Sequence, residues 1–408
     1  MLLKKTARYA IPFLITIAVV GLTFLNLRLS EQFKHQDEFA PRWVAARAWM
    51  RDGSSPYSDE VYQETQDLLS EQGFTAGDFS QGHFLDPVFY LYLYIPFSFL
   101  DYPVARAIWM TIIELSCIAG GWISLKLAGL KINALESILL ILLVTLCYPT
   151  FKVILSASVL PLFIFLVLLA CHSAMQGKST TAGILLFLCI GMVPASVFVA
   201  IFFMIWRGSR RDNSLPPIYL AGVAFLLVSS LLLFPQWIPD WFANAISVHA
   251  DFSWLDTPLM RVASFFPGAK DPIAIFLHVL VLFVMLVEWY GIVGKGQRQI
   301  QWKILLTLSL LYFVNPTASG AYFLFVWPGL FLFFSFIEEK WKISGKIIRW
   351  AILIALVYDY WTIFQNTQNW SEIEPTSVVV LLPALALIGL QWTRWWALDS
   401  PKPLMDHR

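Results

Sequence analysis

The sequence predicts an all-helical protein that crosses a membrane about twelve times. Hydrophobic residues make up 58% of its 408 residues and charged residues only 13%, whereas charged residues are about 25% of a typical soluble domain. The apolar residues come in blocks of roughly 18–24, long enough to cross a hydrocarbon core of about 30 Å as a helix. Because lipid offers the backbone no hydrogen-bond partner, helices are the expected form of these blocks.

One pair of predicted spans has two interpretations. Segments 180–193 and 194–206 form either one long helix kinked at Pro194 or two short helices that meet near Gly191 and Pro194. A single crossing would move the basic segment 207–211 to the outside, so the positive-inside rule favours the broken pair. The predicted spans are 9–29, 103–125, 133–151, 156–175, 180–193, 194–206, 216–236, 273–294, 303–314, 320–337, 347–364 and 376–396.

The N-terminus has a basic start and then an apolar run that is too long for a signal-peptide core, so we interpret it as an uncleaved first span. With this helix starting inside, both termini are cytoplasmic and most of the 28 Lys and Arg residues fall in cytoplasmic loops. The long polar loops 30–102 (loop 1) and 237–272 (loop 2) then lie outside. We expect one membrane domain, 1–408, that meets its substrate on the extracytoplasmic side.

Several kinds of chemistry lack support in the sequence. The net charge of +1 gives no reason to expect a nucleic-acid partner. None of the six histidines shows HExxH or paired metal-ligand spacing, so we expect no metal. There is no P-loop and no other nucleotide motif, and we expect no cofactor. The cysteines lie in apolar segments without C-x-x-C spacing and are interpreted as small hydrophobic residues: Cys117, Cys147, Cys171 and Cys189.

Loop 1 is expected to contain two helices and a hairpin. Phe39, Trp43, Ala46 and Met50 recur at helical spacing, which predicts an amphipathic helix on the outer membrane surface. A second helix is expected over 59–72. The segment 87–100 is apolar, too short to span and interrupted by proline, which favours a re-entrant hairpin.

Asp37 is the candidate catalytic residue. It precedes the first loop-1 helix, so one interpretation is a helix N-cap. The other is a general base at the membrane surface, where partial loss of water would raise its pKa toward the working pH.

Other polar residues are candidates for binding substrate or phosphate, each with a plainer structural alternative. Asp86 fits a turn before Pro87, and His83 fits an ordinary loop histidine. Arg106 and Lys152 lie at helix ends, where anchoring at the interface competes with anion binding. In loop 2, Arg261 is the best single cation for a phosphate. His249 lies in the same polar cluster, among tryptophans typical of an interfacial belt.

The motifs resemble those of a known family. Asp37-Glu38-Phe39, Ala45-Ala46, Gly53 and Pro56-Tyr57 are similar to the D-F…A-A…G-x-x-P-Y pattern of glycosyltransferase family 87, within the GT-C superfamily. The resemblance continues through Pro87-Val88-Phe89, Pro96-Phe97, Ala105, Trp109, Gly183, Pro194, Asn315-Pro316 and Tyr322 to Pro328. Tyr57 and Tyr322 lie in these motifs and complete the candidate binding set.

The chain departs from the family pattern at three places. Val193 precedes Pro194 where the family often has lysine, which removes one expected phosphate contact. Ala157-Ser158 stands where the family often has Gly-Gln, and Asp86-Pro87 where it often has paired prolines.

The resemblance implies a GT-C-like bundle and an inverting sugar transfer outside the plasma membrane. The donor would be a mannose-like hexose or a pentose on polyprenyl phosphate, and the acceptor a glycan or glycolipid. Asp37 would take the acceptor proton, and Arg261 and Arg106 would stabilise the departing phosphate. Two other functions stay open: a transporter or flippase, suggested by the Pro-interrupted segments, and a non-catalytic relative that binds lipid-linked sugar.

Overall fold

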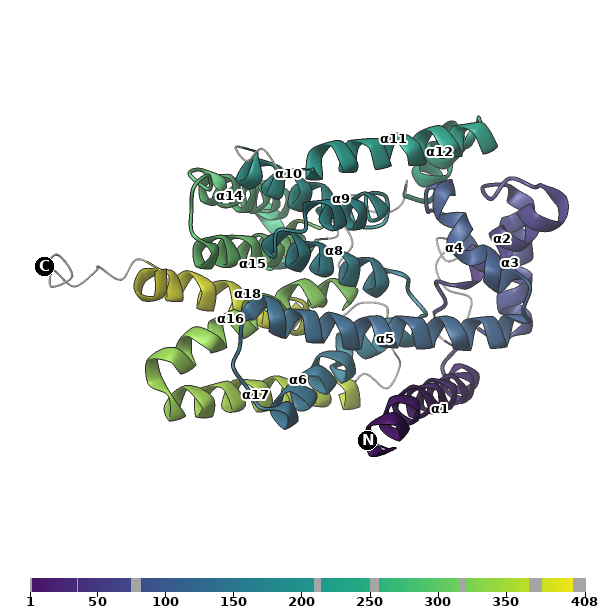
Figure 1. The fold of residues 1–408 in the computed structure, drawn as a ribbon. Helices are drawn as coiled ribbons and strands as arrows, with labels where there is room; N and C mark the ends of the chain where they lie inside the picture. The colour runs from purple at the N-terminus through teal and green to yellow at the C-terminus, as the bar shows by residue number, and fades with distance from the viewer. Residues whose placement is uncertain are drawn as a thin grey trace, which may run out of the picture. The chain divides into compact units, whose positions relative to one another are not determined.

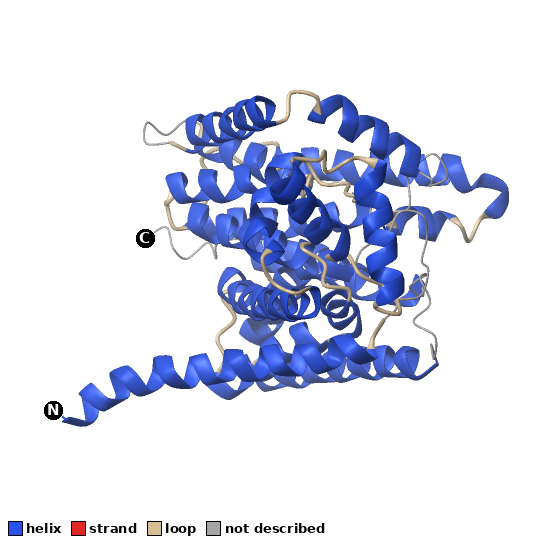
Figure 2. Ribbon diagram, turned by 90° about the vertical axis from the view of Figure 1, so that its right-hand side faces the viewer, coloured by secondary structure: helices blue, strands red, loops and turns tan. Residues whose placement is uncertain are grey.

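Every regular element that the computed structural model describes is a helix (Figures 1 and 2). The structure describes residues 2–34, 36–74, 82–208, 214–249, 257–315, 320–366 and 376–398. The all-helical prediction is confirmed over these ranges. The chain divides into two compact units: Met1–Ser116 with Lys152–Val159 and Leu226–Asp251, and Cys117–Phe151 with Leu160–Phe225 and Phe252–Arg408.

The first unit holds loop 1. In it, α2 packs against both α3 and α4. The elements that lie wholly in this unit are α1 (Leu2–Gln32), α2 (Ala40–Asp52), α3 (Asp59–Glu71), η2 (Val88–Tyr90), α4 (Leu91–Ser98) and α12 (Trp237–His249). The helices that contribute one part each are α5 (Tyr102–Ala128), α7 (Tyr148–Leu155) and α11 (Leu215–Leu233).

The second unit is built around α16 (Phe323–Trp341), which packs against α15, α17 and α18. The other elements of this unit are α6 (Ala134–Leu146), α8 (Leu160–Met175), α9 (Ser179–Leu188), α10 (Ala195–Arg207), α13 (Pro258–Ala263), η3 (Pro267–Ala269), α14 (Lys270–Trp289), α15 (Gln297–Val314), η4 (Gly320–Tyr322), α17 (Ile343–Asn366), α18 (Thr376–Thr393) and the π-helical segment Arg394–Leu398.

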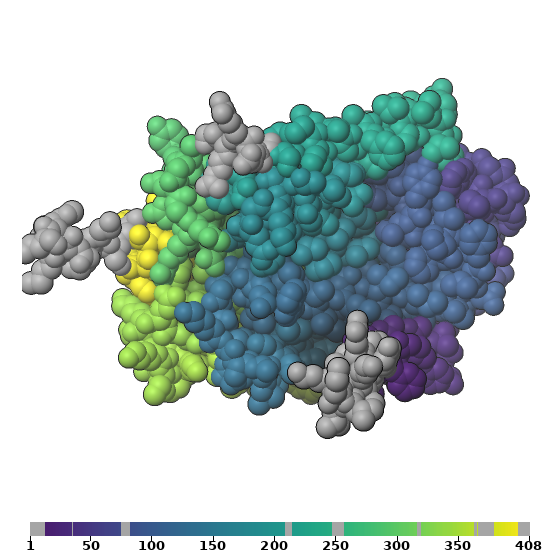
Figure 3. Space-filling view, in the orientation of Figure 1, coloured from purple at the N-terminus to yellow at the C-terminus, as the bar shows by residue number. Residues whose placement is uncertain are grey.

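The burial of the apolar helices fits a multi-pass membrane protein. Among the described residues, six helices are long and apolar enough to cross a membrane, or seven if the bent pair α6 and α7 counts as one span. Several of them turn large apolar side chains outward: on α11, teal in Figure 3, Leu220 is 62% exposed and Leu232 is 79% exposed. Such surfaces are stable against lipid and unfavourable in water. The predicted count of about twelve crossings additionally needs α15, α17 and the shorter apolar helices α8, α9 and α10 to cross.

The broken pair is confirmed as two helices. α9 ends at Leu188, the chain turns through Gly191, and Pro194 caps α10. Proline has no N–H to donate and disfavours helical geometry in the residue before it, so one continuous helix is interrupted here.

The structure corrects two expectations for loop 1. The first helix is present, but it is not a one-sided surface helix: Val44, Ala45 and Ala48 on its other faces are buried, while Met50 is exposed. The segment 87–100 is not a hairpin but one short helix, α4, after a single 3₁₀ turn. Because α2 is buried on several sides, it is a packed internal helix of loop 1. The spacing of its apolar residues alone indicates a surface helix.

Helices α16 and α17 meet in a tight turn at Lys342, whose φ of 45° lies in the left-handed region. The turn brings Gly345, in the first part of α17, against the backbone of α16. A Cβ at Gly345 would lie 2.8 Å from both the Glu338 Cα and the Ile337 carbonyl oxygen. Only glycine fits this approach without movement of the backbone.

We predict that Gly345→Ala lowers the melting temperature of the detergent-solubilised protein by several degrees, because overpacking costs about 1–3 kcal/mol. Gly268→Ala is the matched control, since a Cβ there meets nothing within 4 Å. Equal melting temperatures for the two variants in a thermal-shift measurement would contradict the tight contact.

Candidate functional site

Asp37 caps the helix that follows it. Its Oδ1 accepts hydrogen bonds from the backbone N–H groups of Phe39 (2.7 Å) and Ala40 (2.9 Å). The first amides of a helix have no acceptor within the helix, and Phe39 at the N-cap position cannot supply one. One carboxylate oxygen of Asp37 is therefore committed to the start of α2.

The other oxygen of Asp37 binds two side chains from α5. Oδ2 accepts from the Tyr102 hydroxyl at 2.5 Å and from Nε of Arg106, with which it forms a buried ion pair. Relative exposure is 3% for Asp37 and 1% for Arg106. A carboxylate offers about four acceptor positions, so the four bonds to Asp37 fill them.

Arg106 also reaches the turn between α7 and α8. Its Nη2 donates to the Leu155 carbonyl oxygen at 2.7 Å. One turn further along α5, the indole N–H of Trp109 donates to the carbonyl oxygen of Ala157 at 3.0 Å. Ala157 has φ 54°, a left-handed conformation that costs energy in a residue with a Cβ. The Leu155–Ser158 turn is thus held in shape by α5.

Glu38 joins the same turn to loop 1. Its backbone N–H donates to the Ser156 carbonyl oxygen at 2.9 Å, and its Oε2 accepts from the Ser158 hydroxyl at 2.6 Å. The Glu38 side chain is 41% exposed, in contrast to the fully buried side chain of Asp37. The surrounding protein still removes enough water for burial to raise the pKa of Glu38, an effect that Arg42 only partly offsets.

Arg42 and Asp86 form a bidentate ion pair. Nε of Arg42 lies 2.6 Å from Oδ2 of Asp86, and Nη2 lies 3.0 Å from Oδ1. Burial lowers the pKa of Arg42, but the charge and hydrogen bonds of Asp86 together with the effects of Tyr94 and Glu38 outweigh it, so the net pKa is raised. The Tyr57 hydroxyl donates to the Asp86 carbonyl oxygen at 2.8 Å. Asp86 therefore fixes the loop before η2 to α2, beyond the turn role expected for it.

His83 does not resemble a phosphate-binding cation. Its ring stacks on Tyr62 with 4.2 Å between the centroids. Burial lowers the pKa of His83, and the charge of Asp59 restores only part of it. The uncharged imidazole is therefore favoured at neutral pH.

The remaining candidates are distributed over both units. Lys152, in the last turn of α7, belongs to the first unit. Arg261 in α13 and Tyr322 in η4 belong to the second unit, where Tyr322 is buried. His249 is the last residue of α12, and its side chain lies outside the described residues. The structure thus groups Asp37, Arg106, Asp86 and Tyr57 around α2.

Sequence reasoning missed four members of this group: Arg42, Tyr102, Ser158 and the part played by Glu38. Arg42 follows Glu38 by four residues, a spacing typical of helical ion pairs, although its main partner is Asp86. Nothing near Tyr102 or Ser158 in the sequence indicates their partners, which are 65 and 120 positions away.

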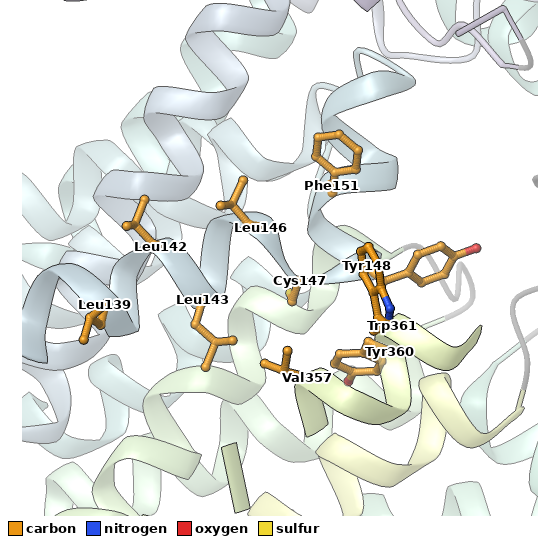
Figure 4. Close-up of a pocket in the computed structure, with 10 residues that line it drawn as sticks. All are labelled: Leu139, Leu142, Leu143, Leu146, Cys147, Tyr148, Phe151, Val357, Tyr360 and Trp361. Carbon is orange, nitrogen blue, oxygen red and sulfur yellow. The ribbon is translucent and has the colours of Figure 1, made fainter. Parts of the chain in front are cut away.

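An apolar cavity of about 480 Å³ lies in the second unit, where α6 and α7 meet at a bend of 58° (Figure 4). The bend follows from Pro149, which fits the first turn of a new helix but not the interior of one. Leucines of α6 form one side of the cavity, and aromatic residues at the bend and on α17 form the other. The lining residues are Leu139, Leu142, Leu143, Leu146, Cys147, Tyr148, Phe151, Val357, Tyr360 and Trp361.

No group of three His, Cys, Asp or Glu residues that could hold a metal ion occurs in the described ranges.

These features define a multi-pass membrane protein, helical throughout the described ranges, with a carboxylate cluster in its first long loop. Residues 84–316, more than half of the chain, match the model of glycosyltransferase family 87, and the chain belongs to this family. Family membership implies glycosyltransferase activity in a membrane. The matched range includes Asp86, Arg106 and Arg261, and it begins after Asp37. Neither the comparison with curated proteins nor that with solved structures gave a significant match.

The raised pKa of Glu38 predicts a pH-dependent stability. Between the ordinary value of 4.5 and the higher folded-state pKa, the folded protein keeps a proton that the unfolded chain has released. The contribution of Glu38 to wild-type stability therefore falls as pH rises through this window and is constant above it. Because Glu38→Gln has no proton to release, its melting temperature relative to wild type should increase from pH 4.5 to pH 7. A difference that stays constant or decreases would contradict the assignment.

Proposed function

We propose that this family member transfers a sugar from a polyprenyl-phosphate donor to a glycan or glycolipid acceptor outside the plasma membrane, with inversion at the anomeric carbon. Glycosyltransferase family membership and the membrane-type helices support this proposal. A lipid-linked donor agrees with a sequence that has no nucleotide-binding motif. The GT-C-like bundle of about twelve spans, with cytoplasmic termini, is part of the same proposal.

The general base in this proposal is Asp37, and its bond with Tyr102 carries the argument. The Tyr102 hydroxyl already donates to Oδ2 at 2.5 Å. An acceptor hydroxyl that displaced Tyr102 would donate to the same oxygen, within the reach that proton transfer requires. The acceptor oxygen would then bond to the anomeric carbon while the bond from that carbon to the phosphate oxygen breaks. The proton passes to Asp37, and the bond electrons leave with the phosphate.

The structure changes the role that we propose for Arg106. Its Nε donates to Asp37, its Nη2 donates to the Leu155 carbonyl oxygen, and its Nη1 contacts the sulfur of Met110. We assign it to positioning the Asp37 carboxylate. Arg261 stays the proposed cation for the departing phosphate, where a positive charge stabilises the negative charge that develops.

Replacement of Asp37 by asparagine tests the base. We predict at least about a hundredfold loss of sugar transfer, measured as release of polyprenyl phosphate from a purified lipid-linked sugar donor. The variant also leaves Arg106 without its carboxylate, which costs about 3–5 kcal/mol of stability. Activity is therefore expressed per folded molecule, taken from the monodisperse fraction in size-exclusion chromatography.

Two companion variants make this test specific. Asp101→Asn changes an exposed aspartate of the same loop in the same way and should retain transfer. Glu38→Gln neutralises the neighbouring, more exposed carboxylate. A large loss in Glu38→Gln with full activity in Asp37→Asn would move the base role to Glu38.

The transporter hypothesis makes a different prediction. A transporter moves a lipid-linked or polar substrate across a liposome membrane and forms no glycosidic bond. A non-catalytic relative binds the donor and does neither. Product analysis in proteoliposomes therefore separates all three functions, and flux without a product would overturn the proposed enzyme.

A further inference from the structure

We infer that the second unit holds a binding site for the phosphate group of an anionic phospholipid, between α14, α15 and the Arg394–Leu398 segment. The inference does not depend on the proposed sugar transfer. A cavity of about 330 Å³ lies there, a size that suits a headgroup. Its lining residues are Val287, Glu288, Tyr290, Gly291, Lys295, Gln299, Trp302, Lys303, Arg394 and Leu398.

The charges in this cavity favour an anion. Lys295, Lys303 and Arg394 line it together with a single carboxylate, that of Glu288. Glu288 is 5% exposed and forms ion pairs with two of these cations. Its Oε2 lies 3.1 Å from Nζ of Lys303, and its Oε1 lies 2.5 Å from Nη1 of Arg394. One carboxylate cannot balance three cations, so the cavity keeps a positive charge.

The guanidinium of Arg394 is held in place and keeps donors for a further acceptor. The Arg394 guanidinium lies over the ring of Trp302, with 5.6 Å to its centroid. The Trp302 indole N–H in turn donates to the Leu390 carbonyl oxygen at 3.0 Å. Within the described chain, the Arg394 guanidinium donates its hydrogen bond through Nη1, to Glu288. Nε and Nη2 therefore remain for a second acceptor, and a phosphate suits the geometry of arginine.

The surroundings indicate a lipid as the source of the phosphate. Tyr290, at the rim of the cavity, is 89% exposed, and Trp395, beside Arg394, is 77% exposed. Exposed Tyr and Trp side chains are typical of the level of lipid headgroups. In the last turn of α14, Leu286 is 58% exposed and Val287 is 50% exposed. A ligand at this site would thus have its phosphate among the cations and its acyl chains along α14.

The predicted topology places this site on the cytoplasmic side, where anionic phospholipids concentrate and where basic pockets between helices bind their headgroups. Loop 1 is predicted to lie outside. The phosphate of the proposed sugar donor therefore belongs to a different site.

The test measures binding of phosphatidylglycerol to the full-length protein in neutral detergent, by native mass spectrometry and thermal shift. Wild type should bind it saturably and gain thermal stability, while phosphatidylcholine should do neither. Lys295→Gln should weaken binding roughly fivefold, and Lys295→Gln with Arg394→Gln roughly 25-fold, at about 1 kcal/mol for each basic residue. Lys295 has no part in the Glu288 ion pairs, so the single variant tests the site without disturbing them.

The matched control is Lys346→Gln, which removes one positive charge from an exposed position on α17 and should bind like wild type. Equal weakening in this control would show a general charge effect and overturn the site, as would unchanged binding in the double variant. Inorganic phosphate at millimolar concentration is the third arm. Protection by it as strong as that by phosphatidylglycerol would overturn the lipid assignment in favour of a soluble anion.

Discussion

The buried ion pair between Asp37 and Arg106 is the interaction on which the architecture of loop 1 depends. The aspartate carries the first amides of α2 on one oxygen and two side chains of α5 on the other. The arginine extends the connection to the carbonyl oxygen of Leu155. Three segments distant in sequence are therefore joined through one ion pair. Removing either partner would leave a buried charge without compensation, which is far more costly than the pair itself.

This arrangement explains why Asp37 and Glu38, adjacent in sequence, have such different surroundings. Asp37 faces the packed interior with its acceptor positions filled, while Glu38 faces the Leu155–Ser158 turn and keeps 41% of its side chain exposed. The strained conformation of Ala157 persists because Trp109 and Glu38 hold the residues around it. Strain of this kind collects where the surrounding structure imposes a local geometry.

The sequence was informative wherever a local rule governs the outcome. Apolar block length predicted the helices, and Pro194 with the charge distribution predicted the break between α9 and α10. Periodicity failed for α2, since it does not register the packing of this helix against both α3 and α4 or the burial of Val44 and Ala48. Within the candidate site, Asp37 stood out by its position before a helix. Tyr102 and Ser158 did not, since their bonds to the carboxylates arise only when the chain folds.

The burial of Asp37 affects whether a reactive sugar donor is used for transfer or lost to hydrolysis. A transferase that exposed its base to bulk solvent would activate water as readily as an alcohol, and the donor would be wasted by hydrolysis. On the proposed mechanism, the Tyr102 hydroxyl fills the position from which a water molecule would lose its proton. Only an acceptor bound tightly enough to displace tyrosine would gain access. The aromatic side chain would thus act as a gate that discriminates between sugar transfer and hydrolysis.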